Sequence, residues 1–297
     1  RDPAGAGLPQ CLDFCPVRAA GFPVQQSIAA TEIIPAGDRD LPRYPFETDS
    51  NLRPPGISPF AIVSSDKNYP YVTGSLDTNG DGLADVLVGA PLSDPTALGD
   101  AGRSYVVFGK TTATPVDLSS IAGGTGGFVI NGQVVSDRSG VSVASAGDVN
   151  GDGLADLIIG AYLSDPAVAT DAGRSYVVFG KSATTAIDLS AIAAGTGGFV
   201  INGQCASDWS GISLASAGDV NGDGLADLLI GANLSDPAAG SNAGRSYVVF
   251  GKTSTTAIDL SAIAAGSGGF VIHGQCASDL SGGSVASAGD VNGDGLT

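Results

Sequence analysis

The chain has few of the side chains that most often do chemistry in enzymes. Among its 297 residues are one histidine, four cysteines, one tryptophan and no methionine. No nucleophile recurs beside the single histidine, His273, so we expect no acid–base or nucleophilic constellation and no enzyme within this chain. The missing methionine and the first residue, Arg1, indicate a fragment or a processed form.

Basic residues are also scarce, and no apolar run is long enough to cross a membrane. The chain has 13 Lys and Arg against 30 Asp and Glu, for a net charge of -17. A nucleic acid needs a basic surface that neutralises its phosphates, so we expect no nucleic-acid partner. A membrane helix needs about 20 consecutive apolar residues, so we expect no membrane span. The excess of acid suits a protein that binds cations.

One acidic stretch recurs at a fixed interval. Asp148–Asp156 reads Asp-Val-Asn-Gly-Asp-Gly-Leu-Ala-Asp, and it recurs at Asp219–Asp227, in a rougher form at Asp77–Asp85, and in part from Asp290. The first aspartates stand at 77, 148, 219 and 290, so each step is 71 residues. A period of this length indicates stacked or radially arranged structural units.

Each copy of this stretch has the composition of a cation-binding loop. Oxygen-bearing side chains occupy positions 1, 3, 5 and 9, and a glycine at position 6 allows a sharp turn. Such ligands favour a hard cation, above all Ca²⁺, over zinc or copper. An EF-hand would need glutamate at position 12, where Val88, Ile159 and Ile230 stand. The alternative is a hairpin loop held by Asx turns without a metal, in which three carboxylates would repel one another.

Around these loops, each repeat reads as four short strands. In the second repeat we predict them at Val141–Ala146, Leu157–Ala161, Ser175–Phe179 and Phe199–Ile201. The first has small residues that suit a crowded axis, and the second is apolar throughout, so it should be covered on both faces. Asp188 could cap a short helical turn between the third and fourth strands. Four strands per repeated unit are typical of a β-propeller blade, and we therefore predict an all-β propeller.

Residues 1–58 do not show the repeat. Eleven of the 16 prolines lie at or before Pro70, and proline at this density favours irregular or extended chain. We predict a proline-rich, non-repeat segment over residues 1–58 and propeller repeats over residues 59–297, the last of them truncated. Cys11 and Cys15 could form a local disulfide in an exported protein or remain free thiols.

The repeats resemble the FG-GAP repeats of the integrin α-subunit β-propeller and its bacterial relatives. In that family an aspartate loop is followed by an apolar strand and then by Gly-Ala-Pro. Gly89-Ala90-Pro91 matches this triplet, and Gly160-Ala161 and Gly231-Ala232 keep its first two residues. The sequence departs from the family at the opening Phe-Gly pair, which is replaced by Ser139-Gly140, Ser210-Gly211 and Gly282-Gly283.

The resemblance implies calcium ligands at positions 1, 3, 5, 7 and 9 of each loop, with position 7 contributing its backbone carbonyl. In the three complete loops these residues are Asp77, Asn79, Asp81, Leu83 and Asp85; Asp148, Asn150, Asp152, Leu154 and Asp156; and Asp219, Asn221, Asp223, Leu225 and Asp227. The incomplete fourth loop offers Asp290, Asn292, Asp294 and Leu296.

The resemblance also implies a role at the cell surface or outside the cell. We expect a calcium-binding adhesion or interaction module of about four blades, with further blades beyond Thr297 and a protein or glycan ligand at the blade-top loops. One alternative is the accessory propeller of a secreted hydrolase of the phospholipase D kind. Another is a structural spacer in a surface protein, because duplication lengthens a spacer without needing a distinct pocket.

Other unusual residues fall in slots that vary among the repeats. His273 stands where the other repeats have Asn131 and Asn202, so we interpret it as a tolerated substitution. Cys205 and Cys276 share a slot with Val134. That equivalence predicts a small, buried position and no disulfide between neighbouring blades.

The single tryptophan and one sequon complete the candidates. Trp209 shares a slot with Arg138 and Leu280. Such variability predicts an exposed turn between blades, where surface or inter-blade packing is favoured over a ligand contact. Asn233-Leu234-Ser235 has the pattern of an N-glycosylation site.

Overall fold

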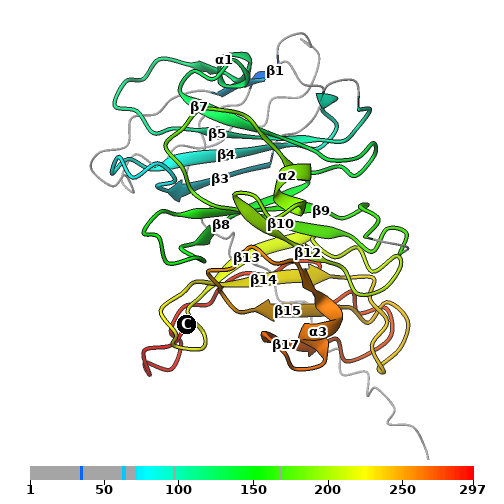
Figure 1. The fold of residues 1–297 in the computed structure, drawn as a ribbon. Helices are drawn as coiled ribbons and strands as arrows, with labels where there is room; N and C mark the ends of the chain where they lie inside the picture. The colour runs from blue at the N-terminus through cyan, green and yellow to red at the C-terminus, as the bar shows by residue number, and fades with distance from the viewer. Residues whose placement is uncertain (1–33, 36–61, 65–70, 96–97, 167–168) are drawn as a thin grey trace, which may run out of the picture.

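The computed structural model describes residues 34–35, 62–64, 71–95, 98–166 and 169–297. Within these residues, three sheets that each contain four antiparallel strands follow one another along the chain, and we number these four-stranded units as blades 1 to 3 (Figure 1). Blade 1 contains β3 (Tyr71–Leu76), β4 (Asp85–Ala90), β5 (Arg103–Val107) and β7 (Gly127–Asn131). Blade 2 contains β8 (Ser142–Gly147), β9 (Asp156–Ala161), β10 (Arg174–Val178) and β12 (Gly198–Asn202). Blade 3 contains β13 (Ser213–Gly218), β14 (Asp227–Ala232), β15 (Arg245–Val249) and β17 (Gly269–His273).

The strands of each blade pair in chain order, as a propeller blade requires. In blade 2, β8 pairs with β9, β9 with β10 and β10 with β12, all antiparallel. The four strands predicted for this repeat agree with the observed ones to within one residue at each end. The predicted class, an incomplete all-β propeller of four-stranded blades, is therefore confirmed.

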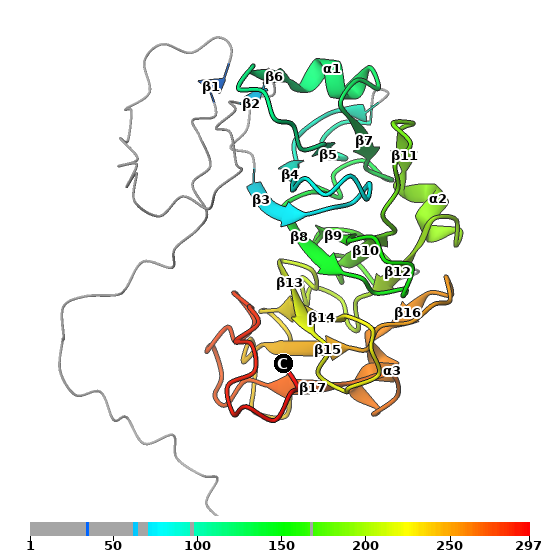
Figure 2. The same ribbon diagram turned by 90° about the vertical axis from the view of Figure 1, so that its left-hand side faces the viewer.

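The first strands of consecutive blades lie side by side. β8 contacts both β3 and β13 (Figure 2). Ser142 Oγ donates to the carbonyl of Gly211 at 2.6 Å, and Ser213 Oγ donates to that of Gly282 at 2.7 Å. These small side chains let successive backbones approach closely, in agreement with the crowded axis that the sequence predicts.

Blades 2 and 3 each give two residues to the sheet of the blade before them, and blade 1 gives two residues to a small separate sheet. The short strands are β6 (Val116–Asp117), β11 (Ile187–Asp188) and β16 (Ile258–Asp259). β11 pairs in parallel with β7 of blade 1, and β16 with β12 of blade 2. β6 pairs in the same way with β2 (Ile62–Ser64), which in turn pairs with β1 (Ile34–Pro35). The sequence did not predict these links, because a two-residue strand leaves no periodic signal.

A one-turn helix follows each linking strand. These helices are α1 (Leu118–Ala122), α2 (Leu189–Ala193) and α3 (Leu260–Ala264). In α1 the Asp117 carboxylate accepts from Ser119 N at 2.8 Å, the expected N-cap bond. Asp188 occupies the N-cap position of α2 but makes no side-chain cap bond. Its carboxylate instead accepts from Asn131 Nδ2 of blade 1 at 2.9 Å, so the predicted cap is replaced by a bond between blades.

The second strand of blade 2 is covered on both faces, as predicted. Ile158 and Ile159 of β9 are each 0% exposed. Ile159 packs in one cluster with Leu87 of blade 1, and Ile158 packs in another with Leu228 of blade 3. The hydrophobic core therefore lies mainly between blades, and each blade needs a neighbour to bury its strands.

The blades do not close into a ring. Residues 282–297 contain the start of a fourth repeat but no strand, and Ser281 makes only a single bridge to Gly244. Phe270 of β17 is 46% exposed, whereas its equivalents Phe128 and Phe199 are 0% exposed beneath the next blade. Three blades are thus complete, and the last of them has an uncovered face.

Two expectations fall wholly or partly outside the described residues. Of the predicted non-repeat segment, residues 1–58, the structure describes only β1, and Cys11 and Cys15 lie outside the described residues. Within the described ranges, no helix has the length and apolarity that a membrane span requires.

Candidate functional site

The candidate site is a set of aspartate loops at one edge of the blades. We name them loop 1 (residues 77–85), loop 2 (148–156), loop 3 (219–227) and loop 4 (290–297). Loops 1 to 3 join the first and second strands of blades 1 to 3, and loop 4 belongs to the fourth repeat. Because the blades share one topology, the loops repeat at the same edge of successive sheets.

The aspartate at position 1 organises each loop. In loop 2, Asp148 Oδ1 accepts from Gly151 N at 2.7 Å and from Asp152 N at 3.1 Å, and Asp148 Oδ2 accepts from Gly153 N at 2.9 Å. Gly151 and Gly153 have φ values of 80° and 89°. This left-handed backbone explains why glycine stands at positions 4 and 6.

Positions 3 and 5 form a second layer of the same turn. Asn150 Oδ1 accepts from Asp152 N at 2.7 Å, and Asn150 Nδ2 donates to Asp152 Oδ2 at 2.9 Å. Asp152 Oδ1 accepts from Leu154 N at 2.9 Å. The same bonds recur in loops 1, 3 and 4 with distances between 2.6 and 3.2 Å.

The aspartate at position 9 lies beneath the loop and joins it to the blade. Asp156 is 0% exposed; its Oδ2 accepts from Val149 N and its Oδ1 from Gly180 N, both at 2.9 Å. The pKa of Asp156 is raised to about 6, chiefly by burial and in smaller part by the nearby carboxylates of Asp152 and Asp148, while the two backbone N–H bonds oppose the shift. Asp85 and Asp227 hold Gly109 and Gly251 in the same way. The glycine after the third strand is therefore an anchor for the loop, a role that sequence spacing did not reveal.

The loop residues fit a hard cation by their chemistry, because the predicted ligands are all oxygen atoms and a carboxylate oxygen that accepts one N–H retains further lone pairs. Within the described residues, however, no three carboxylate, histidine or cysteine groups converge closely enough to hold a metal ion. Positions 1, 3 and 5 lie together in the turn, whereas the position-9 carboxylate is buried against backbone N–H groups. The observed geometry is that of Asx turns, and calcium binding remains a prediction.

The opposite edge of the blades carries a repeated polar cluster. Ser164 Oγ donates to Asp137 Oδ2 at 3.0 Å, and Arg174 Nη1 donates to Ser164 Oγ at 3.4 Å. Asp208, Ser235 and Arg245 repeat this arrangement at the next blade. Burial raises the pKa of Asp137 to about 6, while the bond from Ser164 and the charge of Arg174 oppose the shift.

A small hollow lies beside this cluster. Its volume is about 220 Å³, and its lining includes Val134, Val135, Asp165, Asp171 and Arg174. The side chains of Val134 and Val135 are 47% and 52% exposed. The blade-top turns thus present apolar side chains beside charged ones.

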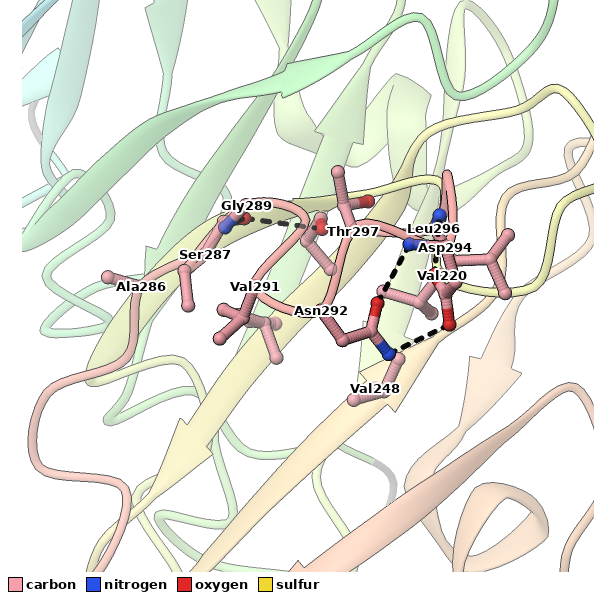
Figure 3. A pocket seen from close by; sticks show the side chains of 13 residues that line it. Val220, Val248, Ala286, Ser287, Gly289, Val291, Asn292, Asp294, Leu296 and Thr297 are labelled. Atoms are coloured by element: carbon pink, nitrogen blue, oxygen red, sulfur yellow. Dashed lines mark hydrogen bonds between the residues drawn. The ribbon is translucent and has the colours of Figure 1, made fainter.

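A larger cavity, of about 370 Å³, lies between blade 3 and the fourth repeat. Its lining includes Val220, Leu229 and Val248 of blade 3 and Val291 and Leu296 of the fourth repeat (Figure 3). Val291 is 82% exposed, whereas its equivalent Val149 is 0% exposed. The cavity therefore lies where the other repeats bury their loop against a neighbouring blade.

Trp209 packs between blades. Its φ is 55°, and its ring lies edge-on to Tyr162 with the centroids 5.2 Å apart. Arg138 Nη1 donates to Tyr162 OH at 3.2 Å. The tyrosine thus contacts residues of the same slot in two successive turns, in agreement with the packing role that was favoured for Trp209.

The cysteine slot differs from its prediction. Val134 and Cys205 are exposed, so the expected burial is wrong: the turn directs this side chain outward. Cys205 is a free thiol, so it forms no disulfide with Cys276. His273 ends β17, opposite Arg245 in the register.

Comparison with known proteins gives the same class as the fold. The FG-GAP repeat family matches residues 69–107, 139–178 and 210–249, which contain the first three strands of each blade. Integrin alpha-PS2 of Drosophila melanogaster is 31% identical over 183 residues, covering 60% of this chain and 11% of that protein. Phosphatidylinositol-glycan-specific phospholipase D of Bos taurus is 32% identical over 178 residues, covering 55% of this chain and 19% of that protein. Integrin alpha-4 of Xenopus laevis is 30% identical over 166 residues, covering 54% of this chain and 14% of that protein.

The fold and the repeated loops define an incomplete β-propeller with aspartate-rich hairpins. The chain contains three FG-GAP repeats and is similar to integrin α chains. It spans less than a fifth of the length of these three relatives.

Proposed function

We propose that this chain is the calcium-binding part of an extracellular adhesion or interaction module. The observation that carries the proposal is the aspartate loop itself, which recurs with the same residue types and the same turn at one edge of three consecutive blades. A structural hairpin needs one Asx turn, yet each complete loop keeps aspartate at positions 1, 5 and 9. A divalent cation offsets the repulsion among these three carboxylates.

In this proposal the cation binds the side chains at positions 1, 3, 5 and 9 and the carbonyl at position 7. In loop 2 the ligands are Asp148, Asn150, Asp152, Leu154 and Asp156, and the corresponding residues serve in loops 1 and 3. Loop 4 has the same residues at positions 1, 3, 5 and 7. Asparagine at position 3 lowers the charge of the site, which favours the weak affinities, about 10⁻⁴ to 10⁻³ M, of extracellular calcium modules.

The test is a calcium titration of the chelator-treated chain by calorimetry, followed by thermal melts. We expect calcium heat, a lower melting temperature in chelator, and better recovery with calcium than with magnesium, whose strict octahedral shell suits this many protein ligands poorly. At a hundredfold excess over Kd, each site should add about 2.7 kcal/mol to the free energy of unfolding.

A matched pair of triple variants makes this test specific. Asp77→Asn, Asp148→Asn and Asp219→Asn together should abolish the heat from the complete loops. Asp94→Asn, Asp165→Asn and Asp236→Asn change the charge equally at exposed, repeated positions outside the loops and should leave it intact. Absence of calcium heat in the unaltered chain, or an unchanged melt in chelator, would leave a plain hairpin turn.

Location and partner follow from the same proposal. Affinities this weak are useful only where calcium is abundant, so we place the protein at the cell surface or in the medium. The blade-top turns are the proposed surface for a protein or glycan ligand, because apolar Val134 and Val135 lie there beside Asp165, Asp171 and Arg174. Finding the native protein only in the cytosol would contradict this location.

The similarity to a phospholipase D favours a second candidate, the accessory propeller of a secreted hydrolase. A third candidate, the structural spacer, rests only on the similarity of the repeat sequences to one another. Mass spectrometry of the native polypeptide distinguishes the first two: a catalytic domain in the same chain would favour the hydrolase.

A further inference from the structure

The aspartate loops are joined to one another in a row. The backbone N–H at position 8 of each later loop donates to the backbone carbonyl at position 1 of the loop before it. The N to O distances are 3.0 Å from Ala155 to Asp77, 2.9 Å from Ala226 to Asp148, and 3.4 Å from Thr297 to Asp219. One hydrogen bond, repeated in register, therefore connects each candidate site to the next.

A side-chain contact accompanies each of these bonds. A Cβ atom added to Gly80, at position 4 of loop 1, would lie 3.1 Å from Cδ2 of Leu154, at position 7 of loop 2. Gly151 and Leu225 repeat this contact at 3.1 Å. The leucine of one loop thus packs against the turn of the preceding loop, so a displacement of one loop backbone would displace the other.

The connecting N–H belongs to the same peptide unit as a proposed ligand. Leu154 C=O and Ala155 N–H are the two ends of one planar trans peptide, and they point in opposite directions. The carbonyl is the position-7 ligand proposed for loop 2, while the N–H binds the position-1 residue of loop 1. A cation on the carbonyl polarises the peptide and strengthens its N–H as a donor, because linked hydrogen-bonding groups polarise one another.

We propose that the loops bind calcium with positive cooperativity, and that the peptide between positions 7 and 8 couples each loop to the one before it. This inference rests on the proposed calcium-binding function. A cation in loop 2 holds the backbone of Asp77 in place for loop 1, and thermodynamic linkage makes the effect reciprocal. Loop 2 is coupled on both sides, through Ala155 to loop 1 and through Asp148 to loop 3, whereas loops 1 and 3 have no direct bond.

Two variants with the same substitution test this order. Both are made in the full chain with loop 4 silenced by Asp294→Ala. In the end variant, Asp81→Ala removes the position-5 ligand of loop 1 and leaves loops 2 and 3 as neighbours. In the middle variant, Asp152→Ala removes the position-5 ligand of loop 2 and leaves loops 1 and 3, which are not neighbours. Calcium calorimetry should give half-saturation at a concentration about fivefold or more higher in the middle variant, and a Hill coefficient above one only in the end variant.

The outcomes separate the coupling from the calcium function. Equal half-saturation with independent sites in both variants would overturn the coupling and leave calcium binding intact. No calcium heat in any chain, including the unaltered one, would overturn the calcium function itself. If the middle variant fails to fold, the chain that carries only the loop 4 substitution tests the proposal instead. As calcium is added, the backbone amide signals of Gly82, Gly153 and Gly224 should change together and steeply. Three unrelated hyperbolic curves would refute the proposal.

Discussion

At the scale of single residues, the position-6 glycines are required by backbone conformation alone. Gly153 has a φ of +89°, and a Cβ atom placed on it would meet nothing within 4 Å. Left-handed backbone costs an L-residue with a side chain about 1–2 kcal/mol. We therefore expect Gly153→Ala to lower the free energy of unfolding by that amount in chelator, measured by urea denaturation.

The control for this substitution is Gly99→Ala. Gly99 also has open space around its Cβ position, but its φ is not in the left-handed region. Alanine there should be neutral or slightly stabilising, because it restricts the unfolded chain. An equal loss at both positions would mean that the loop backbone is not the cause.

Asp137 should make stability depend on pH. Its pKa in the folded state is about 6, above the ordinary value of 3.8, chiefly because of burial. The folded state binds the proton of Asp137 more tightly than the unfolded state does. The resulting contribution to the free energy of unfolding is therefore complete below about pH 4 and is lost as the pH rises through about 6. In Asp137→Asn the free energy of unfolding should decrease less between these pH values than in the parent, as urea melts in chelator will measure.

Asp279→Asn is the matched control for that comparison. Asp279 occupies the same slot in the fourth repeat but is exposed, so no buried carboxyl is removed. Its pH profile should follow that of the parent. Parallel profiles for Asp137→Asn and the parent would show that Asp137 does not hold its proton in the folded state.

At the scale of elements, the connection between blades is a strand of two residues and one side-chain bond. β11 adds to the edge of blade 1, and Asn131 Nδ2 donates to Asp188 there, while Asn131 Oδ1 accepts from Arg103 Nε at 3.2 Å. Asn131→Ala removes both bonds at a partly exposed site. We expect it to lower the free energy of unfolding by about 1 kcal/mol, measured by urea denaturation.

His273→Ala is the control at the same slot of blade 3. No next-blade aspartate lies beside His273 within the described residues, so the substitution should cost clearly less. If both alanines had the same effect, the loss would come from the strand end and not from the contact between blades.

At the scale of the whole molecule, the uncovered face of blade 3 decides the behaviour of the chain in solution. Lys181 of blade 2 lies 4.5 Å from the ring centroid of Phe128, and Lys252 of blade 3 lies 4.4 Å from that of Phe199. Phe270 and Ile272 of β17 are instead 46% and 49% exposed. An apolar sheet face without a neighbour favours association. We therefore expect this chain to self-associate or to be only marginally stable.

Sedimentation will measure this association. Phe270→Ser with Ile272→Thr should shift the chain toward the monomer, because it removes the exposed apolar groups. A matched pair at the exposed turn, Val134→Ser with Val135→Thr, should leave association unchanged. A monodisperse, cooperatively folding monomer of the unaltered chain would contradict this prediction.

The sequence alone determined the period, the four strands of each unit and the loops between the first two. These are readable because each is local: residues 157–161 of β9 form an unbroken apolar run, and the turn of loop 2 is closed by bonds between residues at most five apart. The tertiary structure alone decided how the units meet. Asn131 reaches Asp188 across 57 residues, and Ala155 donates to Asp77 in the preceding blade. A fixed period shows that units repeat, but the register in which neighbouring backbones face one another depends on packing between blades, and no single repeat contains that information.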